Sequence, residues 1–232
     1  MKYLFLGLAI AFTLLFLVLR VTKGGLAGLF SKIVASFAFM TLGLYGLITG
    51  TQTNLLAGFF IILGLLCGFV GDIVLDLKVI YPEQNDPYLN SGMLSFGIGH
   101  VFYFVAAMLL AKGNVNVLVP LIAAGVAGLI MTPAINIGGK KFMKLNFGKF
   151  LWQAVAYTFE LVFMSTLLIC FTIQNAKYLL FALGILLIFV SDMFLSMNYF
   201  QEGQANNKPV VFLNHIIYYA GQILIALFIF LI

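Results

Sequence analysis

The chain has 232 residues, of which 63% are hydrophobic, 16% aromatic and 8% charged, and its formal net charge is +5. A soluble globular protein carries about 25% charged residues, so this chain could not cover its own surface in water. Soluble enzymes, nucleic-acid-binding proteins and disordered chains are therefore excluded, and an all-α polytopic membrane protein remains. At roughly 25–28 residues for each span and its loop, the length predicts about eight helices in one transmembrane domain.

Hydropathy divides the chain into eight continuous apolar runs, all within that single domain of residues 1–232. Each run is long enough to cross a core about 30 Å thick as a helix, and the runs do not alternate as strands would. The runs cover residues 3–19, 33–50, 55–77, 92–111, 115–134, 150–172, 177–198 and 210–231. Polar segments rich in glycine, proline and asparagine separate them, at Lys23-Gly24-Gly25, Thr51 to Asn54, Tyr81 to Pro87, Lys112-Gly113-Asn114, Gly138 to Lys141 and Gln201 to Pro209.

The basic residues predict the orientation. Short loops with more lysine and arginine usually stay in the cytoplasm. One face has nine such residues: Arg20, Lys23, Lys32, Lys78, Lys140, Lys141, Lys144, Lys149 and Lys208. The other face has Lys2, Lys112 and Lys177. We therefore expect an integral protein of a bacterial cytoplasmic membrane with the nine-residue face in the cytoplasm and both termini outside.

The third and seventh runs resemble each other, and so do the fourth and eighth. Phe69-Val70-Gly71-Asp72 matches Phe189-Val190-Ser191-Asp192 at a spacing of 120 residues. Gly99-His100-Val101-Phe102-Tyr103 matches Asn214-His215-Ile216-Ile217-Tyr218 at a spacing of 115 residues. Matching runs that are four spans apart cross the membrane in the same direction, which predicts a parallel internal repeat. The repeat would place both aspartates and both histidines in one layer near the cytoplasmic face.

The polar residues inside the spans are the candidate functional residues. An acidic side chain at the bilayer centre costs on the order of 3 kcal/mol, so such residues usually face an interior cavity and carry function. Asp72 and Asp192 are therefore the candidate catalytic pair. The candidate supporting residues lie on their helical faces, on the returning helices, in the sixth run or near the interface: His100, Tyr103, Asp76, Asn198, Tyr219, Gln222, Glu160 and Lys32.

Several of these residues also have a structural interpretation. Asp76 lies close to a loop and could simply be solvated, and His215 is better explained by a hydrogen bond within its helix. Glu160 could pair with a lysine from a loop or line a pocket. Tyr218 and Tyr219 could belong to the belt of interfacial aromatic residues.

Four motifs, in this order, carry a resemblance to a known family. They are Gly71-Asp72-Ile73-Val74-Leu75, Phe96-Gly97-Ile98-Gly99-His100-Val101-Phe102-Tyr103, Ser191-Asp192-Met193-Phe194-Leu195-Ser196-Met197-Asn198-Tyr199-Phe200 and Tyr218-Tyr219-Ala220-Gly221-Gln222. In combination the motifs resemble the YhhN family of membrane proteins, whose animal members are the transmembrane 86 lysoplasmalogenases. The resemblance implies hydrolysis of the vinyl ether bond of a lysoplasmalogen, a lysophospholipid, to a fatty aldehyde and glycerophospho-ethanolamine or -choline, with Asp72 and Asp192 as the acidic pair.

The residue types suit this chemistry. Vinyl ether hydrolysis needs an acid that keeps its proton and a carboxylate that stabilises a cation or activates water, and two acids in an apolar site can supply both. Which aspartate holds the proton stays open at this point, as does the oligomeric state. His100 and Tyr103 could orient a carboxylate or the water. A phosphate at the interface could meet Lys32, Lys78 or Lys149.

Two other functions compete with this one. A small-molecule or proton-coupled transporter could use the same acidic pair as its binding site, since repeats and intramembrane acids are common in transporters. A metal-dependent hydrolase could use both aspartates and both histidines as ligands, but no short ligand motif joins the two histidines. Cys67 and Cys170 lie in apolar runs and predict neither a disulfide nor a metal site. We therefore expect no metal, no cofactor and no nucleic-acid partner.

Overall fold

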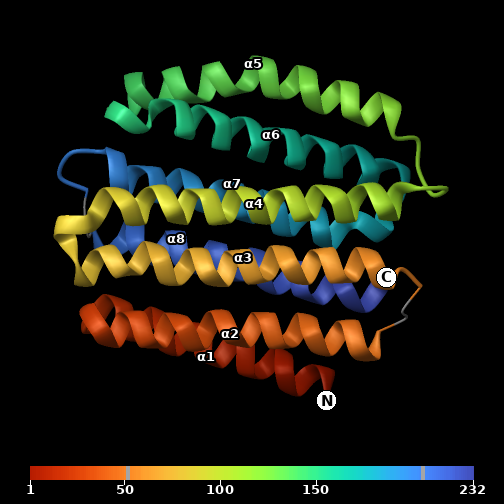
Figure 1. Cartoon of the computed structure of the whole chain (residues 1–232), viewed down its shortest axis with the longest axis horizontal. Helices are drawn as coiled ribbons and strands as arrows, with labels where there is room; N and C mark the ends of the chain where they lie inside the picture. The colour runs from red at the N-terminus through yellow and green to blue at the C-terminus, as the bar shows by residue number, and fades with distance from the viewer. Residues whose placement is uncertain (51–52, 205–206) are drawn as a thin grey trace. The chain divides into compact units, whose positions relative to one another are not determined.

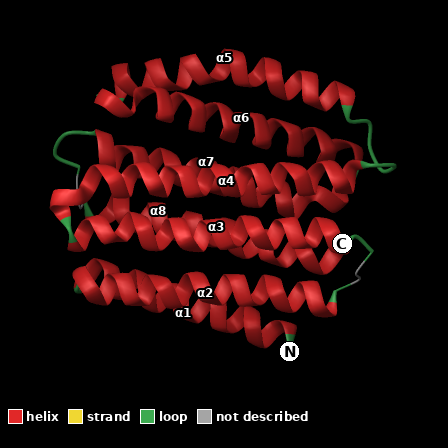
Figure 2. Ribbon diagram, viewed as in Figure 1, coloured by secondary structure: helices red, strands yellow, loops and turns green. Residues whose placement is uncertain are grey.

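The computed structural model describes residues 1–50, 53–204 and 207–232. In these ranges the chain forms eight long helices joined by short connections (Figure 1, Figure 2). All eight helices are long and apolar enough to cross a membrane. The predicted all-α, polytopic membrane fold is therefore confirmed for the described part of the chain.

The helices are longer than the apolar runs in several places. Their bounds are α1 Lys2–Thr22, α2 Gly25–Thr49, α3 Leu55–Ile80, α4 Asn85–Ala111, α5 Leu118–Phe142, α6 Leu151–Gln174, α7 Leu179–Phe200 and α8 Lys208–Phe228. Single 3-10 turns stand at Pro82–Gln84, Gly148–Phe150, Ala176–Tyr178 and Ile229–Leu231. The predicted breaks at Thr51 to Asn54 and Gln201 to Pro209 fall partly outside the described residues.

One predicted break is wrong. Gly138 to Lys141 lie inside α5, which continues to Phe142. The helix ends there because the backbone of Lys144 takes a left-handed conformation with φ 52°, while the N–H groups of Met143 and Leu145 both donate to the Gly139 carbonyl. Two glycines and two lysines look like a loop in sequence, but none of them prevents helical hydrogen bonding.

The chain divides into two compact units. Unit 1 contains Met1–Leu110 together with Gln222–Ile232, and unit 2 contains Ala111–Gly221. The helix α8 therefore begins in unit 2 and ends in unit 1.

In unit 1, α1 packs along α2 and α2 packs along α3 (Figure 1). The turn between α1 and α2 is only Lys23 and Gly24, and it is followed by Gly25. Gly24 and Gly25 have φ values of 60° and 49°, in the left-handed region that glycine adopts at no steric cost. This tight turn brings the end of α1 back onto the first turns of α2.

The contact between α3 and α4 depends on a close approach at Gly64. A Cβ atom at Gly64 would overlap the ring of Tyr103 on α4, and Tyr103 is 2% exposed. Ser95 of α4 adds a hydrogen bond by donating to the Cys67 carbonyl at 2.8 Å. Small residues at a helix interface allow this kind of close packing in membranes, where no hydrophobic force drives helices together.

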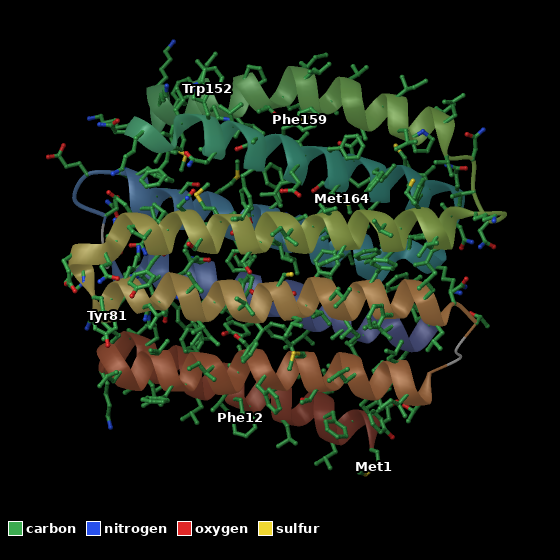
Figure 3. The ribbon with its side chains drawn as sticks, viewed as in Figure 1. Met1, Phe12, Tyr81, Trp152, Phe159 and Met164 are labelled. Atoms are coloured by element: carbon green, nitrogen blue, oxygen red, sulfur yellow. The ribbon has the colours of Figure 1, made fainter. Side chains whose placement is uncertain are left out.

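Unit 2 has the same order of neighbours, because α5 packs along α6 and α6 packs along α7. Phe159 of α6 fills the space beside Gly128 of α5 (Figure 3). Ser191 of α7 donates to Asn214 Oδ1 of α8 at 2.9 Å, and both side chains are buried.

Asp72 and Asp192 occupy the same place within their own helices. Each lies eight residues before the end of its helix, at Ile80 of α3 and Phe200 of α7. Eight residues correspond to about 12 Å along a helix, somewhat deeper than the distance of about 8 Å that the shorter predicted run implies for Asp72. The shared neighbour order is what a duplication would produce, although the internal repeat itself stays a prediction.

The glycine contact generates a stability prediction. Gly64→Ala should lower the free energy of unfolding by about 1–3 kcal/mol, because the new methyl group overlaps a buried tyrosine ring. Thermal unfolding of the purified protein in detergent measures this change. Gly125→Ala on α5 is the matched control, because no atom lies within 4 Å of the position its Cβ would take. Equal melting temperatures for the two variants would show that the α3–α4 approach is not tight.

Candidate active site

Asp72 lies on α3 and faces α2. Its side chain is almost completely buried, at 2% exposure. Ser36 Oγ donates a hydrogen bond to Asp72 Oδ2 at 2.6 Å, and Lys32 Nζ lies 3.2 Å from Asp72 Oδ1. Both carboxylate oxygens therefore have a donor, one neutral and one charged. These are the partners that a buried carboxylate needs when it is taken out of water.

Asp76, one turn further along α3, belongs to the same cluster. Arg20 Nη1 lies 2.9 Å from Asp76 Oδ2 and Arg20 Nη2 lies 3.3 Å from Oδ1, so the guanidinium binds the carboxylate with two hydrogen bonds. Lys32 Nζ lies 3.2 Å from Asp76 Oδ1. Because Asp76 is 3% exposed and paired with two cations, the alternative that it is simply solvated is wrong.

The cluster forms because polar residues on two antiparallel helices have the same spacing. Lys32 and Ser36 are one turn apart on α2, and Asp72 and Asp76 are one turn apart on α3, so each pair lies on one face of its helix. Ser36 then meets Asp72, while Lys32 bridges the two aspartates. We call Arg20, Lys32, Ser36, Asp72 and Asp76 the α1–α3 charge cluster. Its two cations balance its two anions.

A glycine on α2 makes room for the arginine of the cluster. A Cβ atom at Gly28 would lie 3.3 Å from both Cδ and Nη1 of Arg20, which is tighter than ordinary contact. The tight α1–α2 turn and this small residue together let the Arg20 side chain pass across α2 to reach Asp76. The arginine is only partly buried, with its side chain 12% exposed.

Lys32 has partners that the sequence does not indicate. As a lysine just before a predicted span, it is expected to meet a phosphate at the interface. In the structure it is 3% exposed and its ammonium group lies between two carboxylates. Sequence reasoning also missed Arg20 and Ser36 as site residues. A signal for Ser36 was present, because it repeats the polar character of Lys32 one turn later.

Asp192 has a different environment on α7. Tyr157 Oη of α6 donates to Asp192 Oδ2 at 2.8 Å, and Asp192 is only partly buried. Tyr157 was not among the predicted site residues, although it lies on the sixth apolar run one turn before Glu160. Both Glu160 and Asn198 are partly buried in unit 2.

Four further candidates lie on α4 and α8. Tyr103 and Gln222 are brought together, with Tyr103 Oη donating to Gln222 Oε1 at 3.3 Å. The rings of His100 and Tyr103 have their centroids 6.2 Å apart, and both residues are 2% exposed. Tyr219 is fully buried and packs edge-on against Tyr218, which is 5% exposed, so neither is an interfacial belt residue. His215 is buried on α8 beside Asn214.

The structure thus brings some predicted residues together within one unit. Asp72, Asp76 and Lys32 meet in the charge cluster, and Tyr103 meets Gln222, all in unit 1. Asp192 belongs to unit 2. In the described ranges no three His, Cys, Asp or Glu side chains are grouped so that they could hold a metal ion.

Comparison with known proteins gives one match. The family model described as the YhhN family matches residues 12–229 of the 232 residues. No curated protein and no solved structure matches the chain.

The charge cluster generates a second stability prediction. Asp76→Asn alone should lower the free energy of unfolding by about 3–5 kcal/mol, because it leaves buried positive charge uncompensated. The double variant Arg20→Met/Asp76→Asn removes both members of an ion pair. Its loss in free energy of unfolding should therefore be smaller than the sum of the two single losses by about 0.5–3 kcal/mol. Unfolding of the wild type, the two single variants and the double variant in detergent gives this coupling energy. Purely additive costs would contradict the ion pair.

Proposed function

The chain belongs to the YhhN family, and from this premise we propose that it is a membrane-embedded hydrolase of the vinyl ether bond of lysoplasmalogens. The observation that carries the proposal is a buried carboxylate, Asp72, held by a lysine and a serine in an apolar helix bundle. Asp192 stands at the matching position of α7 with a tyrosine as its hydrogen-bond donor. Burying such acids is costly, and a pair of them suits acid–base work on a lipid.

The proposed reaction adds water across the double bond. An aspartic acid transfers its proton to the β-carbon, where the electron pair of the double bond forms the new C–H bond and leaves an oxocarbenium ion. Water adds to the α-carbon and gives a proton to a carboxylate. The hemiacetal then breaks its bond to the glycerol oxygen, which leaves as a hydroxyl group. The products are a fatty aldehyde and a glycerophospho-ethanolamine or -choline, and the aspartates regain their first protonation states.

The depth of Asp72 supports a lipid substrate. The residue lies about 12 Å from the end of α3, and the vinyl ether of a lysoplasmalogen lies just below its head group. A site slightly beneath the interface is therefore at a suitable depth. From the count of basic residues we further propose that this end of α3 faces the cytoplasm and that both termini lie outside.

The first functional prediction concerns the two aspartates. Asp72→Asn and Asp192→Asn should each reduce aldehyde release from lysoplasmalogen by about 10²-fold or more, because each removes a proton-transferring or cation-stabilising group. The assay uses purified protein in detergent and measures the aldehyde. Glu83→Gln is the matched control, since Glu83 is an exposed acid in the α3–α4 connection.

Two results would contradict the proposal. One is aldehyde release that neither aspartate variant reduces. The other is transport of a labelled solute by the protein in liposomes without any lipid turnover, which would favour the transporter alternative.

A second functional prediction concerns which carbon is protonated and which C–O bond breaks. In D₂O the fatty aldehyde should carry one deuterium at the carbon next to its carbonyl, because the acid protonates the former β-carbon. In H₂¹⁸O the glycerol product should contain no ¹⁸O, because its own oxygen leaves. Mass spectrometry of both products measures the labels. Labelled glycerol oxygen would mean that water attacks the glycerol carbon, and the protonation route would be rejected.

A further inference from the structure

The two candidate aspartates differ in the charges around them. Lys32 pairs with Asp72, and one turn further along α3 stands a second acid, Asp76. On α7 the residue one turn after Asp192 is the uncharged Ser196. On α6 the residue one turn before Tyr157 is the uncharged Gln153, where α2 has Lys32 one turn before Ser36. Unit 1 therefore places a charged framework around its aspartate at positions where unit 2 has neutral residues.

We propose that Lys32, itself held by the Arg20–Asp76 ion pair, is a positioning residue that keeps Asp72 as a fixed carboxylate. This inference rests on the proposed hydrolase and gives Asp72 the part of the carboxylate in its reaction.

The contacts explain how the framework acts on Asp72. An ion pair with Lys32 and a 2.6 Å hydrogen bond from Ser36 both favour the charged form of a carboxyl group. Burial alone would favour the neutral form, so the charged form depends on these two partners. Removing Lys32 should therefore change the protonation of Asp72 rather than only its position.

Arg20 acts on Asp72 indirectly. It does not touch Asp72, but its two hydrogen bonds to Asp76 compensate that second acid. Lys32 is then shared between the two aspartates rather than drawn to Asp76 alone. Without Arg20, Asp76 would compete more strongly for the Lys32 ammonium group, and Asp72 would lose part of its counter-charge.

Other titratable groups lie on the helices that form the cluster. Lys78 of α3 interacts electrostatically with Asp76, Arg20 and Lys32. The titratable groups on these helices and on α4 include Arg20 on α1, Lys32 on α2, Cys67, Asp76 and Lys78 on α3, and His100 and Tyr103 on α4; Lys2, Tyr3, Tyr45, Asp86 and Tyr88 lie further along the same helices. The four groups paired directly in the cluster sum to zero charge, which makes the loss of one of them consequential.

The division of roles balances the reaction. The proton donor gives its proton to the β-carbon and becomes a carboxylate, while Asp72 stays an anion that stabilises the oxocarbenium ion. The attacking water returns a proton to the same donor, as a single acid–base group does in retaining glycosidases. The glycerol oxygen then leaves with the hydroxyl proton of the hemiacetal, so no other reactant is needed.

The first test uses Lys32→Met, which keeps the apolar length of the side chain and removes the charge. The variant should lower kcat by about 10²-fold with little change in KM, because Asp72 loses its charged partner. Lys23→Met is the matched control, since Lys23 is an exposed lysine at the end of α1. A loss confined to KM, or an unchanged kcat, would overturn the proposal.

The second test does not depend on whether Lys32→Met folds. Arg20→Met should lower kcat by about threefold to thirtyfold, although Arg20 has no contact with Asp72. Arg20→Met/Asp76→Asn removes the competing acid as well, so it should be faster than Arg20→Met alone. A double variant that is slower than Arg20→Met would overturn the proposal, because a purely structural cluster would only lose further contacts.

The closing measurement separates this inference from the proposed function, because it needs no turnover. Infrared spectra of purified protein near pH 7 detect the C=O band of protonated carboxyl groups, and Asp72→Asn removes any band that belongs to Asp72. In the wild type we expect that Asp72→Asn removes no part of this band. In the Lys32→Met or Arg20→Met protein we expect a band from Asp72, which the added substitution Asp72→Asn abolishes. A protonated Asp72 in the wild type overturns the inference, whereas failure of aldehyde release with the expected spectra overturns only the proposed function.

Discussion

The ammonium group of Lys32, held between Asp72 and Asp76, is the interaction on which the rest of unit 1 depends. Two acids cannot be buried in an apolar helix bundle without compensating charge, and the structure supplies that charge from two neighbouring helices. The short turn at Gly24, the small residue at Gly28 and the matched spacing of polar residues on α2 and α3 all serve this arrangement. Each of them is a local feature, yet together they determine which charges meet.

The two units have the same order of neighbouring helices, but their aspartates have different partners. In unit 1 the aspartate on the third helix is surrounded by charge, and in unit 2 the aspartate on the seventh helix accepts a hydrogen bond from a tyrosine. Unequal surroundings of this kind can give two similar acids different protonation states, which the proposed hydrolysis of a vinyl ether would use.

Much of this could be predicted from sequence, and the reasons differ between residues. The eight spans follow from hydropathy, which is a local property, and Asp72 and Asp192 stand out because charge is rare in apolar runs. Helix ends were less certain, since the segments from Gly25 to Lys32 and from Gly138 to Lys141 each contain two glycines and at least one lysine but still fit a helix. Arg20 and Tyr157 were missed because their roles depend on the register between helices, which no local pattern contains. Ser36 was missed although its place one turn after Lys32 is a local signal. Lys32 was expected at the interface for the same reason.

If the protein hydrolyses a vinyl ether by protonating carbon, as we propose, it should distinguish two closely matched substrates. Purified wild-type protein is given a lysoplasmalogen and, in a parallel reaction, the saturated ether of the same chain length and head group. Both substrates present the same phosphate and nearly the same shape, but only the vinyl ether has a double bond that can accept a proton. We expect fatty aldehyde from the vinyl ether and no cleavage of the saturated ether. Equal cleavage of the two, or no aldehyde from the vinyl ether, would contradict it.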